Sequence, residues 1–395
     1  MPLLPNSLEE NQFDHLVKVF SDFDLVILQR CFVYSIFTLI RRVCTFLGMS
    51  LIFETDDDYL NLPPHNPCYL ALADSNLYTK FQELWEDQKF DEARSLMPLL
   101  ETSRREGLEG YKKILAESDG VIVSTEELRK VYFPFNRNII TLQNNVERVY
   151  SGRDFDCEDD HRFQGPDGKW QIKVPVQQGI LVNIPAWCKI PVSHGGHMVK
   201  RLCRVGYSCT QSHRGNDFDT VKNKLFKTLD KYKTDTWTVY IGDNYFFDQH
   251  PSTGRKFHIR PTEYDLYMIN LRNLDVGIAP LEPNVFNQSK SPIKAIELGS
   301  WGIPCVLPNY ITYNRAFTDN ENALFYNNEE EFGEQLERMI KDEKLRKRLG
   351  DNARELVREN FIEANHSQKR YDWYQSFVKS SYRLRIHRPV GVSNA

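Results

Sequence analysis

Short apolar runs alternate with helix-length segments along most of the chain, and this alternation limits the folds open to it. Runs that are apolar at consecutive positions are typical of strands buried on both faces of a sheet. We predict such strands at residues 24–28, 49–53, 120–124, 138–142, 202–208, 237–241, 276–279 and 304–307. Strands separated by helices form parallel sheets that helices cover on both faces. The sequence therefore predicts an α/β protein with doubly wound sheets.

The alternation breaks between residues 151 and 200, where acidic residues, prolines and the turn sequence G-P-D-G accumulate. At about 150 residues per domain, a chain of 395 residues accommodates two or three domains. We predict an N-terminal domain at residues 1–150, an inserted loop or hairpin and linker at 151–200, a second domain at 201–363, and a C-terminal helix with a basic tail at 364–395.

Charge and hydropathy exclude several classes of protein. The 50 basic and 54 acidic residues leave a net charge of −4, so no overall positive field attracts nucleic acid or an anionic membrane. The most apolar stretch, residues 31–40, is far shorter than the ~20 residues that span a bilayer, and arginines flank it. Residues 1–6 do not resemble a secretory signal, so we expect a cytoplasmic protein. Neither a G-x-G-x-x-G turn after a strand nor a G-x4-G-K-[ST] loop occurs, which argues against dinucleotide oxidoreductases and P-loop ATPases.

The densest group of polar residues follows the predicted strand at 276–279. Lys290, Lys294 and Glu297 are spaced by four and three residues, so they would share one face if this segment were helical from its start. Free N–H groups at a helix start, two ammonium groups and the Ser291 hydroxyl suit a diphosphate, and Glu297 could accept hydrogen bonds from a ribose diol. The alternative is a solvated helix face on which Glu297 merely pairs with Lys294 or Lys290.

These residues belong to four motifs that resemble a known family. The motifs are D-x-G-I-A-P-L at 275–281 with N-x2-K-S-x2-K-x2-E at 287–297 and G-x-P at 302–304, E-x-D-D-D at 54–58, D-G-V-I-V-S-T-E-E-L at 119–128, and G-Y-S-C-T-Q-S-H at 206–213. Together they resemble the GT-B glycosyltransferases of the GT4-like superfamily, also called group 1, in its bacterial and viral branch.

The resemblance implies a fold and an activity. It implies two Rossmann-like domains facing across a cleft, with residues 1–150 on the acceptor side, residues 201–363 binding a nucleotide sugar, and the C-terminal helix crossing back to the first domain. The reaction is expected to be retaining and to need no metal or other cofactor. The donor is expected to be a UDP-sugar, with a GDP-sugar as the alternative.

The resemblance also assigns donor-side residues. Glu297 matches the second glutamate of the E-x7-E pattern, which is expected to hold the donor ribose, whereas the first glutamate is replaced by Ser289. Asn287, Ser289 and backbone amides are expected to take its place at the sugar. The predicted catalytic residues are His213, Lys290 and Glu297. The predicted donor-binding residues are Ser208, Thr210, Arg214, Asn287, Ser289, Ser291 and Lys294.

The acidic triplet Asp56, Asp57 and Asp58, followed by Tyr59, is predicted to meet the acceptor. Clustered carboxylates also suit Mg2+ or Mn2+, but GT-B enzymes generally work without a metal, so we predict no metal site here. An acceptor-hydroxyl contact or a helix cap is the expected role.

Three functions remain open from the sequence. The first is transfer of a sugar to a glycan or lipid-linked glycan. The second is transfer to a hydroxymethylated base in DNA, for which the basic cluster at 200–204 and the tail at 379–388 would form a groove. The third is a catalytically degenerate protein that only binds a sugar nucleotide, which the Ser289 departure suggests.

Overall fold

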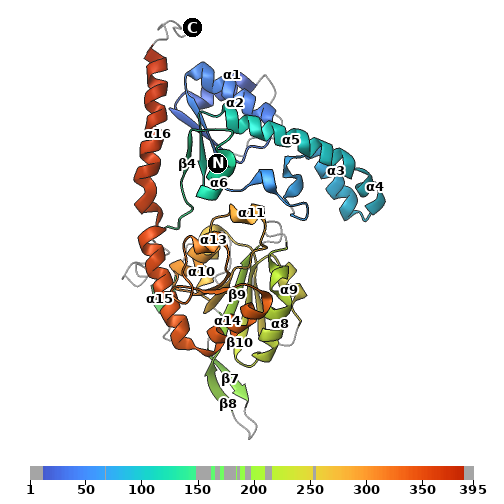
Figure 1. Cartoon of the computed structure of the whole chain (residues 1–395), viewed down its shortest axis with the longest axis vertical. Coiled ribbons are helices and arrows are strands. Elements are labelled where there is room, and N and C mark those ends of the chain that lie inside the picture. Colours follow the sequence, from blue (N-terminus) through green and yellow to red (C-terminus); the bar gives the residue numbers. More distant parts are fainter. Residues whose placement is uncertain are drawn as a thin grey trace. The chain divides into compact units, whose positions relative to one another are not determined.

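The computed structural model describes residues 12–66, 68–147, 162–164, 170–172, 184, 187–191, 197–209, 216–251 and 255–386. The chain forms two compact units (Figure 1). Unit 1 comprises Met1–Pro64, Cys68–Gln143 and His366–Ala395, and unit 2 comprises His65–Pro67 and Asn144–Asn365.

Unit 1 contains a parallel sheet in the order β1-β2-β3-β4. Its strands are β1 (Leu25–Gln29), β2 (Ser50–Thr55), β3 (Gly120–Val123) and β4 (Ile139–Thr141). The helical elements between and before them are α1 (Phe13–Phe20), α2 (Tyr34–Leu47), η2 (Tyr59–Asn61), η3 (Tyr69–Leu72), α3 (Ser75–Glu86), α4 (Phe90–Ser95), α5 (Met97–Glu117) and α6 (Glu126–Tyr132). Thr125 caps α6 by accepting a hydrogen bond from the Leu128 amide, as its sequence position predicts.

The described strands of unit 1 are added in one direction only, so right-handed crossovers carry the connecting helices over a single face of the sheet. On that face Phe53 of β2 packs against Tyr111 of α5, with ring centroids 5.7 Å apart. Side chains alternate between faces along a strand, so Ile52 and Ile122 point to the opposite face. That face needs a separate cover.

The last helix, α16 (Glu363–Ile386), supplies this cover (Figure 1). From His366 onward it belongs to unit 1, where Trp373 and Phe377 pack with Ile52 and Ile122 in one apolar cluster. Gly120 lets the helix approach closely, because a Cβ there would lie 2.6 Å from the Phe377 ring. The aromatic residues near the end of the chain are therefore part of the core of the first unit.

Unit 2 contains a larger parallel sheet in the order β11-β10-β9-β12-β13-β14. Its strands are β9 (Cys203–Cys209), β10 (Thr236–Gly242), β11 (Arg255–Ile259), β12 (Val276–Ile278), β13 (Cys305–Pro308) and β14 (Leu324–Tyr326). The chain begins at β9, builds outward to β11, and returns to place β12 on the other side of β9. The strand order thus reverses between β9 and β12, which defines a topological switch point.

Helices cover both faces of this second sheet. They are α8 (Lys222–Lys231), α9 (Tyr245–Gln249), α10 (Tyr264–Leu271), α11 (Val285–Gln288), α12 (Ile293–Ser300), α13 (Ile311–Asn314), α14 (Glu329–Lys341) and α15 (Glu343–Asn360), with the short turn η5 (Phe218–Thr220). One apolar core contains Leu225 of α8 and Leu336 of α14, and the other contains Leu271, Leu298 and Val357 of α10, α12 and α15.

In the sequence between β4 and β9, the described parts of residues 151–200 form two antiparallel pairs. Strand β5 (Arg162–Gln164) pairs with β6 (Trp170–Ile172), and β7 (Trp187–Pro191) pairs with β8 (His197–Arg201). Hairpin-like pairing is what the turn-rich sequence predicts.

The structure confirms the α/β class with parallel sheets in two Rossmann-like units, and it differs in detail. Unit 1 winds one way among its described strands, so only unit 2 is doubly wound there. Strands β11 and β14 were not predicted, because β11 carries charged residues at a sheet edge and β14 spans only Leu324–Tyr326.

Candidate functional site

The carboxyl edge of β9 and β12 is the place where a ligand is expected, because the loops leaving a switch point diverge there. Ser208 lies near the end of β9 and is 7% exposed. Strand β12 ends at Ile278, and the chain then runs through α11 to α12. The residues predicted to bind the donor follow these strand ends.

Helix α12 begins at Ile293, with Pro292 as its N-cap residue. Lys290 therefore precedes the helix and does not share a helix face with Lys294 and Glu297, which corrects the expected common face. The reason is Pro292, because a proline restricts the residue before it to non-helical conformations. The N-cap residue Pro292 makes no side-chain hydrogen bond to the first N–H groups of α12.

Glu297 lies at the centre of a hydrogen-bond network that joins three elements. The Tyr267 hydroxyl of α10 donates to Glu297 Oε2 (2.8 Å) and lies 3.0 Å from Ser208 Oγ of β9. Lys294 Nζ donates to the Tyr267 hydroxyl (2.9 Å) and to Glu297 Oε2 (3.1 Å). The pairing of Lys294 with Glu297, one of the two alternatives left open by the sequence, is present, but within a buried network.

Burial of this network determines the protonation state of the Tyr267 phenol. Glu297 is 4% exposed, and Lys294 lies over the Tyr267 ring at 4.7 Å from its centroid. Burial, together with the nearby Glu297 carboxylate, raises the pKa of Tyr267 to about 12, so the phenol remains a hydrogen-bond donor at neutral pH. Sequence reasoning missed Tyr267, because nothing in its local pattern indicates that α10 places it beside Glu297.

The remaining residues predicted to bind the donor each make different contacts. Ser291 Oγ accepts a hydrogen bond from Asn144 Nδ2 (2.9 Å), and Lys290 Nζ lies 4.5 Å from the centroid of the Phe286 ring. Ser289 is buried directly after α11. Asn287 donates through Nδ2 to the Asp217 carboxylate at 2.9 Å.

The Asn287 side chain thereby holds the α11 turn in place. It donates a further hydrogen bond to the Glu282 carbonyl (2.9 Å), whereas its Oδ1 atom has no hydrogen-bond partner among the described residues. Of this amide, Oδ1 is the atom left to accept a hydrogen bond from a ligand. The predictions for Thr210, His213 and Arg214 fall on residues 210–215, which lie outside the described part of the chain.

In unit 1 the acidic triplet follows the carboxyl end of β2, and its members differ in role. Asp56 Oδ2 accepts a hydrogen bond from Arg30 (2.8 Å). Arg30 directly follows β1, and its backbone is left-handed, with a φ of 53°. This contact raises the pKa of the Arg30 guanidinium. Both side chains are partly exposed, 54% for Arg30 and 32% for Asp56. The sequence analysis did not single out Arg30.

Asp58 and Tyr59 form part of the framework. Asp58 is fully buried and caps η2 by accepting hydrogen bonds from the backbone (3.2 Å) and side chain (2.8 Å) of Asn61. Tyr59 is 7% exposed, and burial raises its pKa. The Tyr132 hydroxyl accepts from the Tyr59 amide (3.1 Å) and donates to the Asp57 carbonyl (2.7 Å). Of the roles expected for Asp58, the helix cap is the one observed.

Among the described residues, no three or more His, Cys, Asp or Glu side chains are grouped so that they could hold a metal ion. None of the described helices has the length and apolar character that crossing a bilayer requires.

Comparison with known proteins finds a family model that matches part of the chain and solved structures of the same fold. Residues 230–370 match a model of glycosyl transferase-like proteins. A solved glycosyltransferase from Rickettsia africae is 12% identical, with a TM-score of 0.55 over 96% of this chain and 85% of that one. HepE from Anabaena, solved with UDP-glucose, is 8% identical, with a TM-score of 0.52 over 92% and 82% of the two chains. No curated protein matches the sequence.

The chain has the GT-B fold of these solved glycosyltransferases, and the match to the family model covers residues 230–370. A further structure of this fold, the sucrose-phosphate synthase of Thermosynechococcus elongatus, is 12% identical, with a TM-score of 0.52 over 95% of this chain and 80% of that one. The segment that matches the family model contains Tyr267, Lys290 and Glu297. Of the buried network, Tyr267, Lys294 and Glu297 lie inside this segment, whereas Ser208 lies outside it, as do Arg30 and Asp56.

Proposed function

We propose that this protein transfers a sugar from a nucleotide-sugar donor bound at the carboxyl edge of β9 and β12. The observation that carries the proposal is the Ser208–Tyr267–Glu297–Lys294 network at the switch point, beside the start of α12. A buried carboxylate held by a phenol and an ammonium group presents its other oxygen to a ligand in a fixed position. That arrangement suits a ribose diol.

The donor's diphosphate would lie against the start of α12, near Lys290, Ser291 and Lys294, with Arg214 and His213 as further contacts. When the bond between sugar and phosphate breaks, negative charge grows on the leaving diphosphate. Cations and helix N–H groups that are already in position stabilise this charge without reorganisation, and this is where most of the rate gain should arise.

The donor assignment is tested by ligand binding and by turnover. A thermal-shift screen of UDP, GDP, CDP, ADP and their sugars should show stabilisation by one base, with UDP expected, because a ligand that binds only the native state raises its stability. Glu297→Ala and Lys290→Ala should each lower turnover about tenfold or more, since a charged hydrogen bond is worth roughly 1.5–3 kcal/mol.

The matched control is Glu355→Ala, an exposed glutamate on α15. Normal turnover in folded Glu297→Ala protein would remove the donor-site assignment. Donor binding and hydrolysis without transfer to any acceptor would support the donor site but contradict the transferase activity. Donor binding without any turnover would support the catalytically degenerate alternative.

We also propose that the reaction is retaining and independent of metal ions. Activity should persist in EDTA, and the anomeric configuration of the product, read by NMR, should match that of the donor. Complete loss in EDTA with recovery on adding Mn2+ would contradict metal independence.

For the acceptor we propose a glycan or a lipid-linked glycan, with Arg30 and Asp56 as hydroxyl partners in unit 1. The basic cluster considered for DNA is internally paired, because Lys200 contacts Asp235 and both Arg201 and Arg204 contact Asp275. Binding to a glycan should change little with salt. Submicromolar binding to duplex DNA that weakens steeply with salt would instead favour a base in DNA as the acceptor. For each phosphate contacted, log K for DNA should fall by about 0.9 per log unit of salt concentration.

A further inference from the structure

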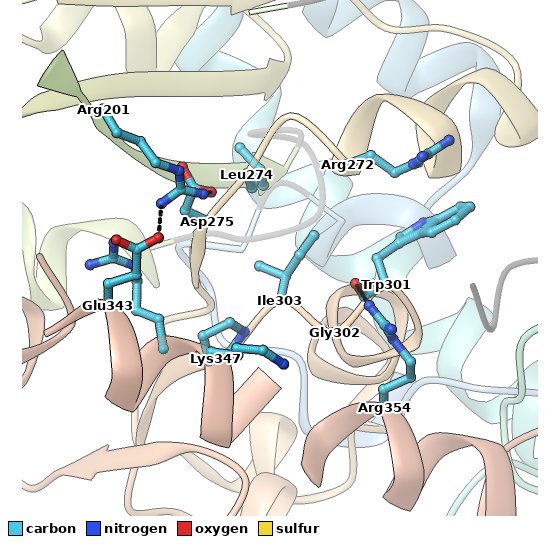
Figure 2. Close-up of a pocket in the computed structure, with 12 residues that line it drawn as sticks. Arg201, Arg272, Leu274, Asp275, Trp301, Gly302, Ile303, Glu343, Lys347 and Arg354 are labelled. Carbon is cyan, nitrogen blue, oxygen red and sulfur yellow. Dashed lines mark hydrogen bonds and ion pairs between the residues drawn. The ribbon is translucent and has the colours of Figure 1, made fainter. Parts of the chain in front are cut away.

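A cavity of about 420 Å3 lies in unit 2, away from the carboxyl edge just described (Figure 2). Its lining includes Asp275, which immediately precedes β12, and Pro304, which immediately precedes β13. The cavity therefore opens at the amino ends of the strands, the sheet edge opposite to the proposed donor site. A pocket of this size is in the range that holds small ligands, roughly 300–1,000 Å3.

The lining is strongly cationic. It contains the basic residues Arg201, Arg272, Arg346, Lys347 and Arg354, against two acidic residues, Asp275 and Glu343. Both carboxylates contact Arg201, at 3.0 Å each. Five positive and two negative side chains line the cavity, and Lys347 also forms an ion pair with Asp351 (2.6 Å), outside the lining. A protein with a net charge of −4 thus concentrates positive charge in one concave place.

Two of these arginines are held by the backbone and not by carboxylates. Arg354 donates through Nη2 to the Trp301 carbonyl (2.7 Å), and Arg346 donates to the Ile340 carbonyl (2.9 Å) near the end of α14. Neither guanidinium makes an ion pair among the described residues, and Arg354 Nε has no hydrogen-bond partner there. Their charges are fixed in position and remain uncompensated by a carboxylate.

The backbone beside Arg354 is shaped to admit its guanidinium group. Gly302 has a φ of 70°, and a Cβ atom there would lie 2.5 Å from Arg354 Nη2. Only glycine adopts this conformation readily and leaves the required space. Figure 2 shows Arg354 against Gly302, with Trp301 between Arg354 and Arg272. The guanidinium carbon of Arg272 is 5.2 Å from the centroid of the Trp301 ring.

We propose that this cavity binds a small ligand that carries two or more phosphate groups. Guanidinium groups offer planar pairs of N–H donors that match phosphate oxygens, and a concave site lets several of them contact one ligand. An extended polyanion such as DNA or an anionic bilayer instead requires a wide basic surface, which a net charge of −4 does not suggest. The concave site therefore favours a small phosphate ester or oligophosphate.

The site is separate from the proposed donor site, although one helix connects them. Trp301 is the C-cap residue of α12, and Lys294 lies in the first turn of the same helix. Seven residues separate them, which is about 10 Å along a helix axis. The proposal does not depend on the donor assignment.

The test is calorimetric titration of the full chain with inorganic tripolyphosphate, in the wild type and in four variants. Lys294→Ala alters the proposed donor site alone and should retain tripolyphosphate binding at the cavity. Arg354→Gln and Lys347→Glu should each weaken that binding about tenfold or more, the effect of losing one charged hydrogen bond or contact to a ligand.

Lys344→Glu is the matched control. It makes the same charge change as Lys347→Glu on an exposed residue of α15, three positions away and outside the cavity lining. Its affinity should stay within about twofold of wild type, since exposed charges at a distance are largely screened. Lys347 is itself exposed, with a side-chain exposure of 76%, so Lys347→Glu should fold even if Arg354→Gln does not.

Three results would overturn the proposal. The first is wild-type affinity in both Lys347→Glu and Arg354→Gln. The second is loss of binding in Lys294→Ala alone, which would assign the phosphate to the donor site. The third is binding of duplex DNA or phosphatidylserine vesicles that depends on Lys347 while free tripolyphosphate does not bind, which would indicate an extended polyanion surface.

Discussion

In unit 1 the chain adds its described strands in one direction from β1 to β4, whereas in unit 2 it starts at β9 and builds outward to both edges. The second route brings helices to both faces and creates a switch point between β9 and β12, where the outgoing loops diverge. The first route leaves one face bare, and α16 has to cover it. The comparison shows that two sheets of the same class can differ both in where a ligand fits and in what completes the core.

The largest expected effect tests the cover of unit 1. Phe377→Ala should reduce the stability of unit 1 by about 3–5 kcal/mol, because Phe377 is 8% exposed and its removal leaves a cavity against the sheet. Urea unfolding followed by tryptophan fluorescence should show this loss in one transition only. Tyr371→Ala, on the same helix but 57% exposed, is the control. Equal destabilisation of both units would contradict the conclusion that α16 stabilises unit 1 alone.

The next effect concerns the switch point of unit 2. Tyr267→Phe removes the hydroxyl that joins Ser208, Lys294 and Glu297, so affinity for the donor's nucleoside diphosphate should fall about tenfold, the value of one or two hydrogen bonds. Calorimetric titration measures it. Tyr264→Phe, on the same helix and 47% exposed, should bind normally. Unchanged affinity in Tyr267→Phe would mean that the network serves the fold alone.

A third test uses acid to separate the two units. Burial, with a smaller contribution from Lys256, lowers the pKa of His250 in unit 2 to about 4, whereas in the unfolded chain it is about 6.5. As the pH falls from 6.5 to 4, the unfolded chain takes up a proton that the folded unit does not, so the free energy of unfolding of unit 2 falls over this pH range. Urea unfolding at several pH values should locate this loss in the unit 2 transition.

His250→Gln should flatten this dependence, while His15→Gln, an exposed residue of unit 1, should leave it unchanged. An acid-induced loss of the same size in His250→Gln would show that another group is responsible.

The smallest expected effect on stability is at Arg30. Arg30→Gly relieves a left-handed backbone conformation and removes a partly exposed ion pair, two changes of about 1 kcal/mol or less that act in opposite directions. Stability should therefore change little. If Arg30 serves the acceptor, transfer should fall while hydrolysis of the donor persists, as measured with a radiolabelled donor. Equal loss of both reactions would place Arg30 in donor chemistry instead.

The sequence predicts the repeating features of the fold because these depend on local patterns. Buried strands such as β3 and β12 are continuous apolar runs, and the Thr125 cap is local. The edge strand β11 cannot be predicted in this way, because Arg255 and Lys256 break its apolar pattern. The one-way winding of unit 1 cannot be inferred from the same pattern, because the order of strands depends on contacts between distant segments.

The candidate site divides in the same way. The motif spacing indicates Glu297 and Lys294, which the structure brings together on one turn of α12. It does not reveal Tyr267, thirty residues earlier, because that contact depends on how α10 packs against α12. A helix cap is among the roles predicted for the acidic triplet, but the sequence does not indicate that Asp58 is the member that takes it, by holding Asn61.

The return of α16 to unit 1 has a consequence for synthesis on the ribosome. Unit 2 is nearly continuous in sequence, from Asn144 to Asn365, and its whole sheet has been translated before α16 begins. Unit 1 is translated first, yet one face of its sheet stays uncovered until Trp373 and Phe377 have been made more than 200 residues later. Domains generally fold as units during synthesis. We therefore expect the half made first to complete its folding last, and its exposed sheet to be the part that chaperones bind in the meantime.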